Sequence, residues 1–261
     1  MRWFLQLAYR GAGFSGWQVQ PGGVRTVQGV LEDALGKLLR CSTPLTGAGR
    51  TDAGVNASMM VAHFDTDGDI SDKDRFMASL NGMADPQAIA VAGLTQVGDD
   101  AHARFDATSR TYRYYFHTSR SPFLEPLSWR APGNLDVDAM NEAAALLTGI
   151  SDFTSFAKLH SDARTNICRL DHARVVRVSG DETGARYYFE IQADRFLRNM
   201  VRAVMGTLAD VGRHKITPAA VLDIASRLDR CAAGTSMPPE PLFLHNITYP
   251  YWTPASRCPL P

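Results

Sequence analysis

Long apolar runs and closely spaced cysteines are both missing from this chain of 261 residues. The four cysteines lie far apart and form no Cys-x-x-Cys pair, which argues against a zinc or redox motif and predicts free thiols in a reducing compartment. No stretch approaches the length of a membrane span, and the apolar run in residues 1–8 is too short for a secretory signal. We therefore expect a soluble, cytoplasmic protein that has no membrane partner.

Net charge is also missing, since 27 basic residues balance 27 acidic ones. A total of zero argues against a nucleic-acid-binding protein, but the charges are segregated along the chain. Residues 65–106 hold nine Asp against three basic residues, whereas residues 195–215 hold five basic residues against one acid. A neutral total can therefore conceal a basic face. The histidines show no ligand spacing, so no metal is expected.

Apolar residues make up 45% of the chain, enough for a sizeable core in one large domain or two ordinary ones. β-prone runs predict strands at residues 3–9, 58–65, 88–97, 111–118, 173–179, 186–193 and 243–249. Apolar residues at helical spacing predict helices at 26–40 with Thr26 as N-cap, at 72–83 entered through Ser71, at 136–148, at 199–211, and from Thr217 with Pro218 in its first turn. Turn residues at 180–184 predict a hairpin. We expect an α/β (α+β) fold with a mainly antiparallel or mixed sheet.

One loop, GAGRTDAGVNA at residues 47–57, stands out from these elements. Its three glycines allow sharp turns and close approach to a ligand. Between them the loop presents a lone carboxylate, Asp52, with Arg50 two residues before it. The loop fits neither the P-loop nor the Rossmann pattern, and such a segment taken alone is usually an ordinary turn. Local spacing therefore does not decide between an ordinary turn and a ligand-binding loop.

The longer pattern resembles the TruA family of tRNA pseudouridine synthases. The loop, FSGWQVQPGGVRTVQGVLEDAL, RFDATSRTYRYYF, DFTSFA and RFLRNMVRAVMGTLADVG are all similar to runs of that family, in the same order. The chain departs from the family pattern at Asn56, where His is usual, at Arg10, where Asp is usual, and at Pro241, where Gly is common. None of these departures touches Asp52, so they bear on the fit of RNA more than on activity.

The resemblance implies two ferredoxin-like halves that share an extended sheet, with helices packed on it and a central cleft. We place the domains at 1–105 and 106–261. The resemblance further implies an enzyme without a cofactor that isomerises uridine to pseudouridine at positions 38, 39 and 40, in the anticodon stem-loop of tRNA. It also implies a homodimer.

The resemblance implies central roles for three side chains. Asp52 is the essential carboxylate, which can attack the sugar at C1′, add to the base or remove a proton. Arg202, on an otherwise apolar predicted helix, is expected to pair with Asp52, the alternative being a solvated or snorkelling side chain. Tyr112 shares a strand face with Tyr114, and although strand aromatics are usually core, the resemblance gives Tyr112 the role of stacking on the base.

Further arginines are expected to contact the RNA. Arg50 is expected to contact the phosphate of a flipped base or to fill the gap that the base leaves, with pairing to a nearby acid as the alternative. Arg110 and Arg198 are expected to contact phosphates, and for Arg198 a plain surface position is the alternative.

Two other functions remain to be weighed. A non-catalytic RNA-binding module would leave Arg50, Asp52 and Arg202 unexplained. A hydrolase that cleaves the glycosidic bond would normally need a second carboxylate, and the sequence places none near Asp52.

Overall fold

Two compact units make up the chain, and each is described by itself. The computed structural model describes residues 1–159, 164–181 and 184–255. The first unit contains Met1–Thr108 together with the described residues from Leu244 on, and the second contains Ser109–Phe243. These units differ from the bounds expected for the two domains, because the chain returns to the first unit at its C-terminal end. The division into two ferredoxin-like domains stays a prediction.

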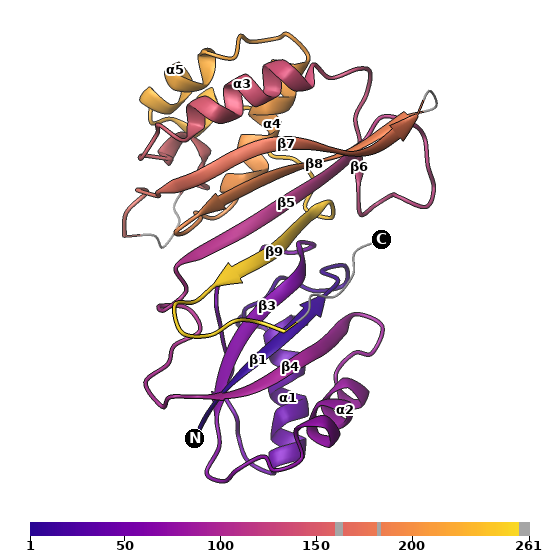
Figure 1. Cartoon of the computed structure of the whole chain (residues 1–261), viewed down its shortest axis with the longest axis vertical. Coiled ribbons are helices and arrows are strands. Elements are labelled where there is room, and N and C mark those ends of the chain that lie inside the picture. The colour runs from indigo at the N-terminus through magenta and orange to yellow at the C-terminus, as the bar shows by residue number, and fades with distance from the viewer. Residues whose placement is uncertain (160–163, 182–183, 256–261) are drawn as a thin grey trace. The chain divides into compact units, whose positions relative to one another are not determined.

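The first unit is built on antiparallel strands with two helices on one side (Figure 1). Its strands are β1 (Arg2–Tyr9), β2 (Thr46–Gly47), β3 (Asn56–Asp65), β4 (Ile89–Val97) and most of β9 (Leu242–Thr248). Its helices are α1 (Val27–Leu39) and α2 (Lys73–Met83). The strand order is β4-β1-β3-β9, and β1 pairs antiparallel with both β3 and β4.

Strand β1 is buried on both faces, although its sequence alternates only loosely. One reason is that the segment after β9 packs on it. The ring of Phe4 lies 5.3 Å from that of Tyr249 and 5.4 Å from that of Trp252. The Gln6 side chain donates a hydrogen bond to the carbonyl of Ala255. The C-terminal segment therefore completes the core of the first unit.

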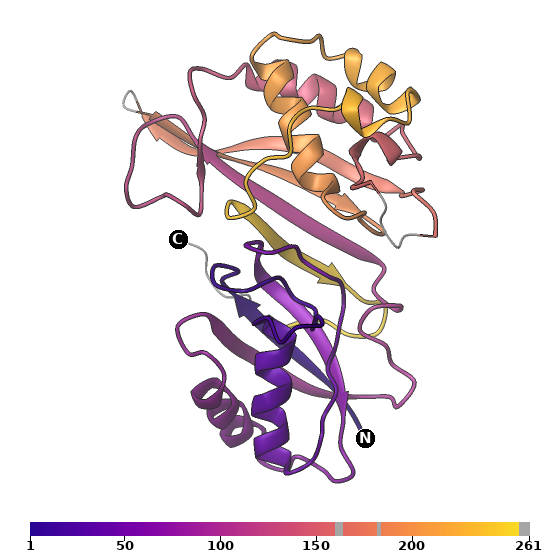
Figure 2. The ribbon, with the colours of Figure 1, turned by 180° about the vertical axis from the view of Figure 1, so that it is seen from behind.

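The second unit repeats the pattern of strands covered by helices. Its strands are β5 (Ser109–His117), β6 (Trp129–Arg130), β7 (Leu170–Asp181) and β8 (Gly184–Ala193). Its helices are α3 (Val137–Leu147), α4 (Met200–Gly212) and α5 (Ala220–Ser226), with short 3₁₀ turns at Thr154–Phe156 and Arg230–Ala232. The order β5-β8-β7 is antiparallel throughout, and the helices lie on one side of it (Figure 2).

The predicted α+β class and mainly antiparallel pairing are confirmed, and most predicted elements lie where expected. Thr26 is the N-cap of α1, and its side chain accepts from the N–H of Gly29. The predicted entry of α2 through Ser71 is wrong, since Asp72 is the N-cap and accepts from the N–H of Arg75. The helix expected from Thr217 begins three residues later, after a turn.

The predicted hairpin is confirmed by the antiparallel pairing of β7 with β8, although residues 182–183 lie outside the described ones. Strand β7 begins at Leu170, earlier than the predicted 173. Strands β2 and β6 were not predicted, because two residues carry no periodicity.

Candidate functional site

The loop 47–57 doubles back immediately after Asp52. The N–H of Val55 donates to the carbonyl of Asp52 at 3.1 Å, and Gly54 between them has φ +81°. A side chain at position 54 would be strained in this left-handed conformation, so the glycine is required by the turn. The turn leaves Asp52 half-buried and Arg50 exposed.

Thr51 anchors the loop on the side that precedes Asp52. Its hydroxyl lies 2.8 Å from that of Tyr9, at the end of β1, and its carbonyl accepts from the N–H of Trp17 at 3.2 Å. Both aromatic residues are almost fully buried, and their rings lie 5.9 Å apart. Trp17 and Phe14 therefore pack in the core of the first unit.

Asn56 anchors the loop on the other side. It is 1% exposed, and its Oδ1 accepts from the N–H of Gly11 at 2.7 Å. The carboxylate of Asp52 thus stands on a short turn that is fixed at both ends to the segment following β1. Such fixing limits the positions that a catalytic group can take, which is what a site on a loop requires.

In the second unit, two side chains of β5 contact the segment between β8 and α4. Arg110 donates from Nη1 to the carbonyl of Asp194 at 2.8 Å. The ring of Tyr112 meets that of Phe196 edge to face, with centroids 5.0 Å apart at 82°. Arg198 is exposed on the same segment. The structure therefore brings Arg110, Tyr112 and Arg198 around residues 194–199.

Arg202 projects from α4, of which every residue is buried except Arg202 and Asp210. Its Nε donates to the carbonyl of Met237, and its own carbonyl accepts from the Met237 N–H at 3.2 Å. The segment that carries Met237 lies directly against α4, because a Cβ at Gly206 would be 1.9 Å from the carbonyl oxygen of Thr235. The Nε of the guanidinium group is thus bound to the backbone of Met237, so the side chain does not extend freely from the helix.

The aromatic residues next to Tyr112 are mainly core, as predicted. Tyr114 and Phe116 are fully buried, and Tyr115 is half-buried. The hydroxyl of Tyr114 has no hydrogen-bond partner among the described residues, and burial raises its pKa far above the ordinary value. Tyr114 therefore stays protonated and contributes mainly packing to the second unit.

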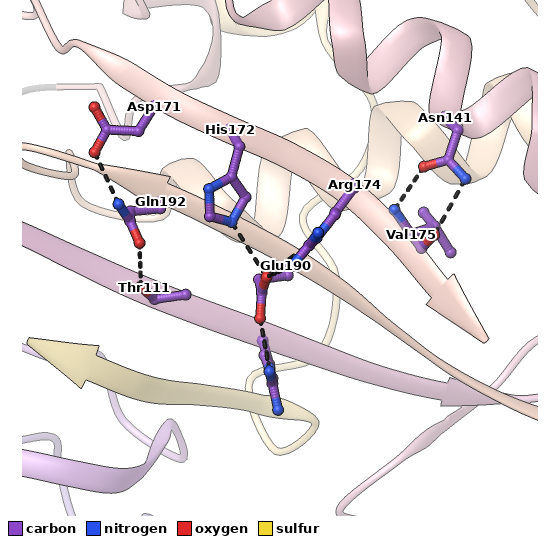
Figure 3. A network of polar contacts seen from close by, with 9 residues as sticks. Thr111, Asn141, Asp171, His172, Arg174, Val175, Glu190 and Gln192 are labelled. Atoms are coloured by element: carbon purple, nitrogen blue, oxygen red, sulfur yellow. Dashed lines mark hydrogen bonds and ion pairs between the residues drawn. The ribbon is translucent and has the colours of Figure 1, made fainter. Parts of the chain in front are cut away.

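A polar network on the strands of the second unit was not predicted (Figure 3). Glu190, on β8, is 5% exposed and accepts from Arg113 on β5 and from Arg174 on β7 at 2.8 and 2.7 Å. His172 lies 3.2 Å from the same carboxylate. Burial raises the pKa of Glu190, but the two arginines outweigh it and hold the pKa at about 2. Its three partners come from two other strands, so no local pattern could reveal this network.

Neither a metal-binding cluster nor a membrane-spanning helix is present among the described residues. No group of three or more His, Cys, Asp or Glu side chains there is arranged to hold a metal ion. In the same part of the chain, no helix is both long and apolar enough to cross a membrane. Cys41, Cys168 and Cys231 are free thiols, whereas Cys258 lies outside the described residues. Burial raises the pKa of the Cys168 thiol to about 11.

Comparison with known proteins covers nearly the whole chain. The chain is 49% identical to the tRNA pseudouridine synthase A of Parabacteroides distasonis, over 95% of this chain and 96% of the relative. It is 50% identical to that of Bacteroides thetaiotaomicron and 41% identical to that of Geobacter sulfurreducens, over at least 94% of this chain and 91% of each relative. A family model described as tRNA pseudouridine synthase matches residues 143–250.

The chain belongs to the TruA family of tRNA pseudouridine synthases.

Within this TruA family member, the three departures from the family pattern have identifiable surroundings. Asn56 supplies the acceptor for Gly11 described above. Arg10 is exposed, and its N–H donates to the carbonyl of Ala88. The carbonyl of Pro241 accepts from the N–H of Tyr115. None of the three positions leaves a strained backbone, and their effect on RNA fit stays a prediction.

The structure also adds residues that the sequence did not single out for this TruA-type site. Phe196 supports Tyr112, Met237 holds Arg202, and Tyr9 holds Thr51. Phe196 lies in the run RFLRNM that carried the resemblance, so its position was visible although its contact was not. The other two contacts join residues 35 and 42 positions apart, and neither has a local signal.

Proposed function

We propose that this protein isomerises uridine to pseudouridine at positions 38, 39 and 40 in the anticodon stem-loop of tRNA, with Asp52 as the essential carboxylate. The observation that carries the proposal is the full-length relation to proteins named tRNA pseudouridine synthase A. The fixed position of Asp52 on its turn supports it further. A base must leave the helical stack to reach a half-buried carboxylate, so the target uridine is flipped out.

The reaction breaks the bond from C1′ of the ribose to N1 of uracil and forms a bond from C1′ to C5. The hydrogen on C5 leaves as a proton, and N1 gains a proton, so the base keeps its atoms and no oxidant or second substrate is consumed. Asp52 can attack C1′, add to the base or remove the C5 proton. Each role ends in the same release of the C5 hydrogen to water.

Five further residues complete the proposed site, namely Arg202, Tyr112, Arg50, Arg110 and Arg198. Arg202 pairs with Asp52, which places a positive charge beside the carboxylate and fixes its rotamer. Tyr112 stacks on the flipped base, and its edge-to-face contact with Phe196 supports a fixed ring orientation. Arg50 contacts the phosphate of the flipped nucleotide or fills the gap in the stack.

Arg110 and Arg198 contact phosphates in this proposal. We place the protein in the cytoplasm as a homodimer, in which one tRNA spans two subunits. The exposure of Arg198 supports its assignment. Arg110 is already bound to the carbonyl of Asp194, so it has only part of its hydrogen-bonding capacity left for RNA.

The test is release of tritium from tRNA labelled at C5 of uridine. The wild-type protein should release label to water without any added cofactor. Asp52→Asn keeps the size of the side chain but removes its charge, so release should fall to background. Its affinity for tRNA should change little, because one small side chain adds little to an interface dominated by phosphate contacts. Arg202→Met should also reduce release strongly, because it removes the cation proposed to pair with the carboxylate of Asp52. A rate near wild type for Asp52→Asn would refute the assignment.

The same assay separates the two alternative functions. A hydrolase would liberate free uracil, whereas an isomerase leaves the base attached to the ribose. A non-catalytic RNA-binding module would bind tRNA without releasing label. The absence of a second carboxylate from the loop 47–57 disfavours the hydrolase.

A further inference from the structure

Phe105 exposes 75% of its surface in the first unit, although it is a large aromatic residue. It lies in the loop between β4 and β5, next to the exposed Arg104. The ring rests on the imidazole of His102, with centroids 4.3 Å apart and planes at 34°. The guanidinium carbon of Arg104 lies 5.8 Å from the ring centroid. A largely exposed aromatic ring and a cation are therefore presented together at this loop.

The backbone that carries Phe105 is held by two histidines. The N–H of Ala103 donates to Nδ1 of His63 at 3.1 Å. The next two N–H groups donate to Nδ1 of His102, at 3.1 and 3.3 Å. Burial and the charge of Arg2 lower the pKa of His63 to about 4, so its Nδ1 is available as an acceptor at neutral pH. Both imidazoles thus act as backbone acceptors.

The loop is closed at its other end by Asp106. Its Oδ2 accepts from the N–H of His102 at 2.7 Å and from the hydroxyl of Tyr251 at 2.6 Å. The hydroxyl of Tyr249 donates to the carbonyl of Ala103. Every backbone N–H of residues 102–106 donates a hydrogen bond within the first unit. A loop built in this way holds the exposed ring in one place without covering it.

We propose that Phe105 stacks on an unpaired nucleobase of the RNA substrate, with Arg104 facing the adjoining phosphate. Unpaired bases are held on aromatic rings, and such stacking tolerates any base because each presents a π face. His102 already supports the ring of Phe105, so little side-chain freedom is lost on binding. This inference rests on the proposed function for the identity of the RNA, and it adds a base contact outside the loop 47–57.

The experiment measures the Kd of the full-length protein for an unmodified tRNA transcript at fixed salt. Phe105→Ala should raise the Kd about 5- to 150-fold, the range of base–aromatic stacking. Phe105→Leu should behave like Ala, whereas Phe105→Tyr and Phe105→Trp should keep most of the affinity. The dependence of Kd on salt should not change, because stacking releases no counterions. Turnover at saturating tRNA should stay near wild type.

Phe123 provides the matched control, since it is 94% exposed and lies in the other unit between uncharged neighbours. Phe123→Ala should leave the Kd unchanged. An unchanged Kd for Phe105→Ala, or equal binding by the Phe and Leu proteins, would overturn the inference. So would a change in sedimentation of Phe105→Ala without a change in Kd, which would mean that the ring contacts a second copy of the chain.

A second pair of variants separates the supporting loop from the ring itself. His102→Ala removes both the imidazole under Phe105 and the acceptor for two N–H groups, so it should weaken tRNA binding as well. His102→Asn restores an acceptor for these groups and should recover part of the affinity.

If the wild type fails to release tritium from labelled tRNA, the proposed function fails. If it releases label and Phe105→Ala binds as wild type, only the present inference fails.

Discussion

Tyr112 combines a ring and a hydroxyl that different substitutions can separate. Its ring contacts Phe196 edge to face, and its hydroxyl is proposed to transfer a proton in the last step of the reaction. Tyr112→Phe keeps the ring, so it should bind tRNA as wild type and release tritium more slowly. Tyr112→Leu removes both functions and should be worse in binding and in rate. Equal rates for the Phe and Leu variants would mean that the ring does not stack on the base.

Asn56 shows how the structure accommodates a departure from the family pattern. Asn56 stands where the family usually has His, yet its Oδ1 makes a short hydrogen bond to the N–H of Gly11 while 1% exposed. A buried amide of this kind stabilises a structure because its partner would otherwise be unsatisfied. The loop that carries Asp52 therefore keeps a firm attachment at this end.

Among the elements, each unit has a helix asparagine whose side chain binds the backbone of an edge strand. In the first unit, Asn81 on α2 accepts from the N–H and donates to the carbonyl of Val91 on β4. In the second unit, Asn141 on α3 does the same for Val175 on β7 (Figure 3). β4 and β7 are edge strands in their units. Each amide therefore binds backbone groups of an edge strand that could otherwise pair with a strand of another chain.

The Glu190 network predicts a stability effect in the second unit. Glu190→Gln leaves Arg113 and Arg174 without a carboxylate, which should lower the local free energy of unfolding by about 2–3 kcal/mol. Hydrogen exchange of amides in β5, β7 and β8 reports on this unit directly. Asp223→Asn, at an exposed carboxylate of α5, is the control and should change the free energy by less than about 0.5 kcal/mol.

The same network sets a pH dependence. The folded-state pKa of Glu190, about 2, lies below its ordinary value of 4.5, so the unfolded chain binds more protons between these values. The stabilisation by Glu190 is therefore complete above pH 4.5 and is lost as the pH falls toward 2. The difference between wild type and Glu190→Gln should shrink over this window. A difference that is constant from pH 7 to pH 3 would show that the charge is not its cause.

At the scale of the whole molecule, the neutral net charge does not prevent a salt-dependent interaction with RNA. Arginines that contact phosphates release counterions, so the affinity for tRNA should fall steeply as salt rises. Arg198→Glu should weaken binding and reduce the slope of log K against log salt by at least about 1, without abolishing turnover at saturating tRNA. Arg110 is less suited to this test, because its reversal would also break the bond to Asp194.

Arg227, exposed at the end of α5, is the control for this measurement. Arg227→Glu changes the net charge by the same amount, and its slope should equal that of the wild type. An affinity that does not depend on salt would contradict a basic RNA-binding face. Equal effects of the two reversals would attribute the change to net charge rather than to a phosphate contact at Arg198.

Features whose residues are contiguous along the chain could be predicted from the sequence. The loop 47–57 marked Asp52 as a candidate, because its glycines and its one carboxylate lie within eleven residues, but the role of Asp52 came from the resemblance and stays a prediction. Periodicity predicted the main helices and strands, and Thr26 was correctly predicted as the N-cap of α1. Caps and amphipathic faces can be predicted because they depend on residues only a few positions apart. Periodicity was sufficient for the α+β class, and the ordered set of runs similar to those of one family was sufficient for the family.

Contacts between segments that are distant in the chain could not be predicted and are seen only in the folded structure. Such contacts join residues that lie 16 to 77 positions apart. They include the hydrogen bonds of Tyr9 to Thr51, of Ala103 to His63, and of Arg113 and Arg174 to Glu190. The return of the segment after Leu244 to the first unit is of the same kind. Such contacts depend on which strands pair and which faces are covered, and a one-dimensional pattern does not encode either, because the partners share no spacing in the chain.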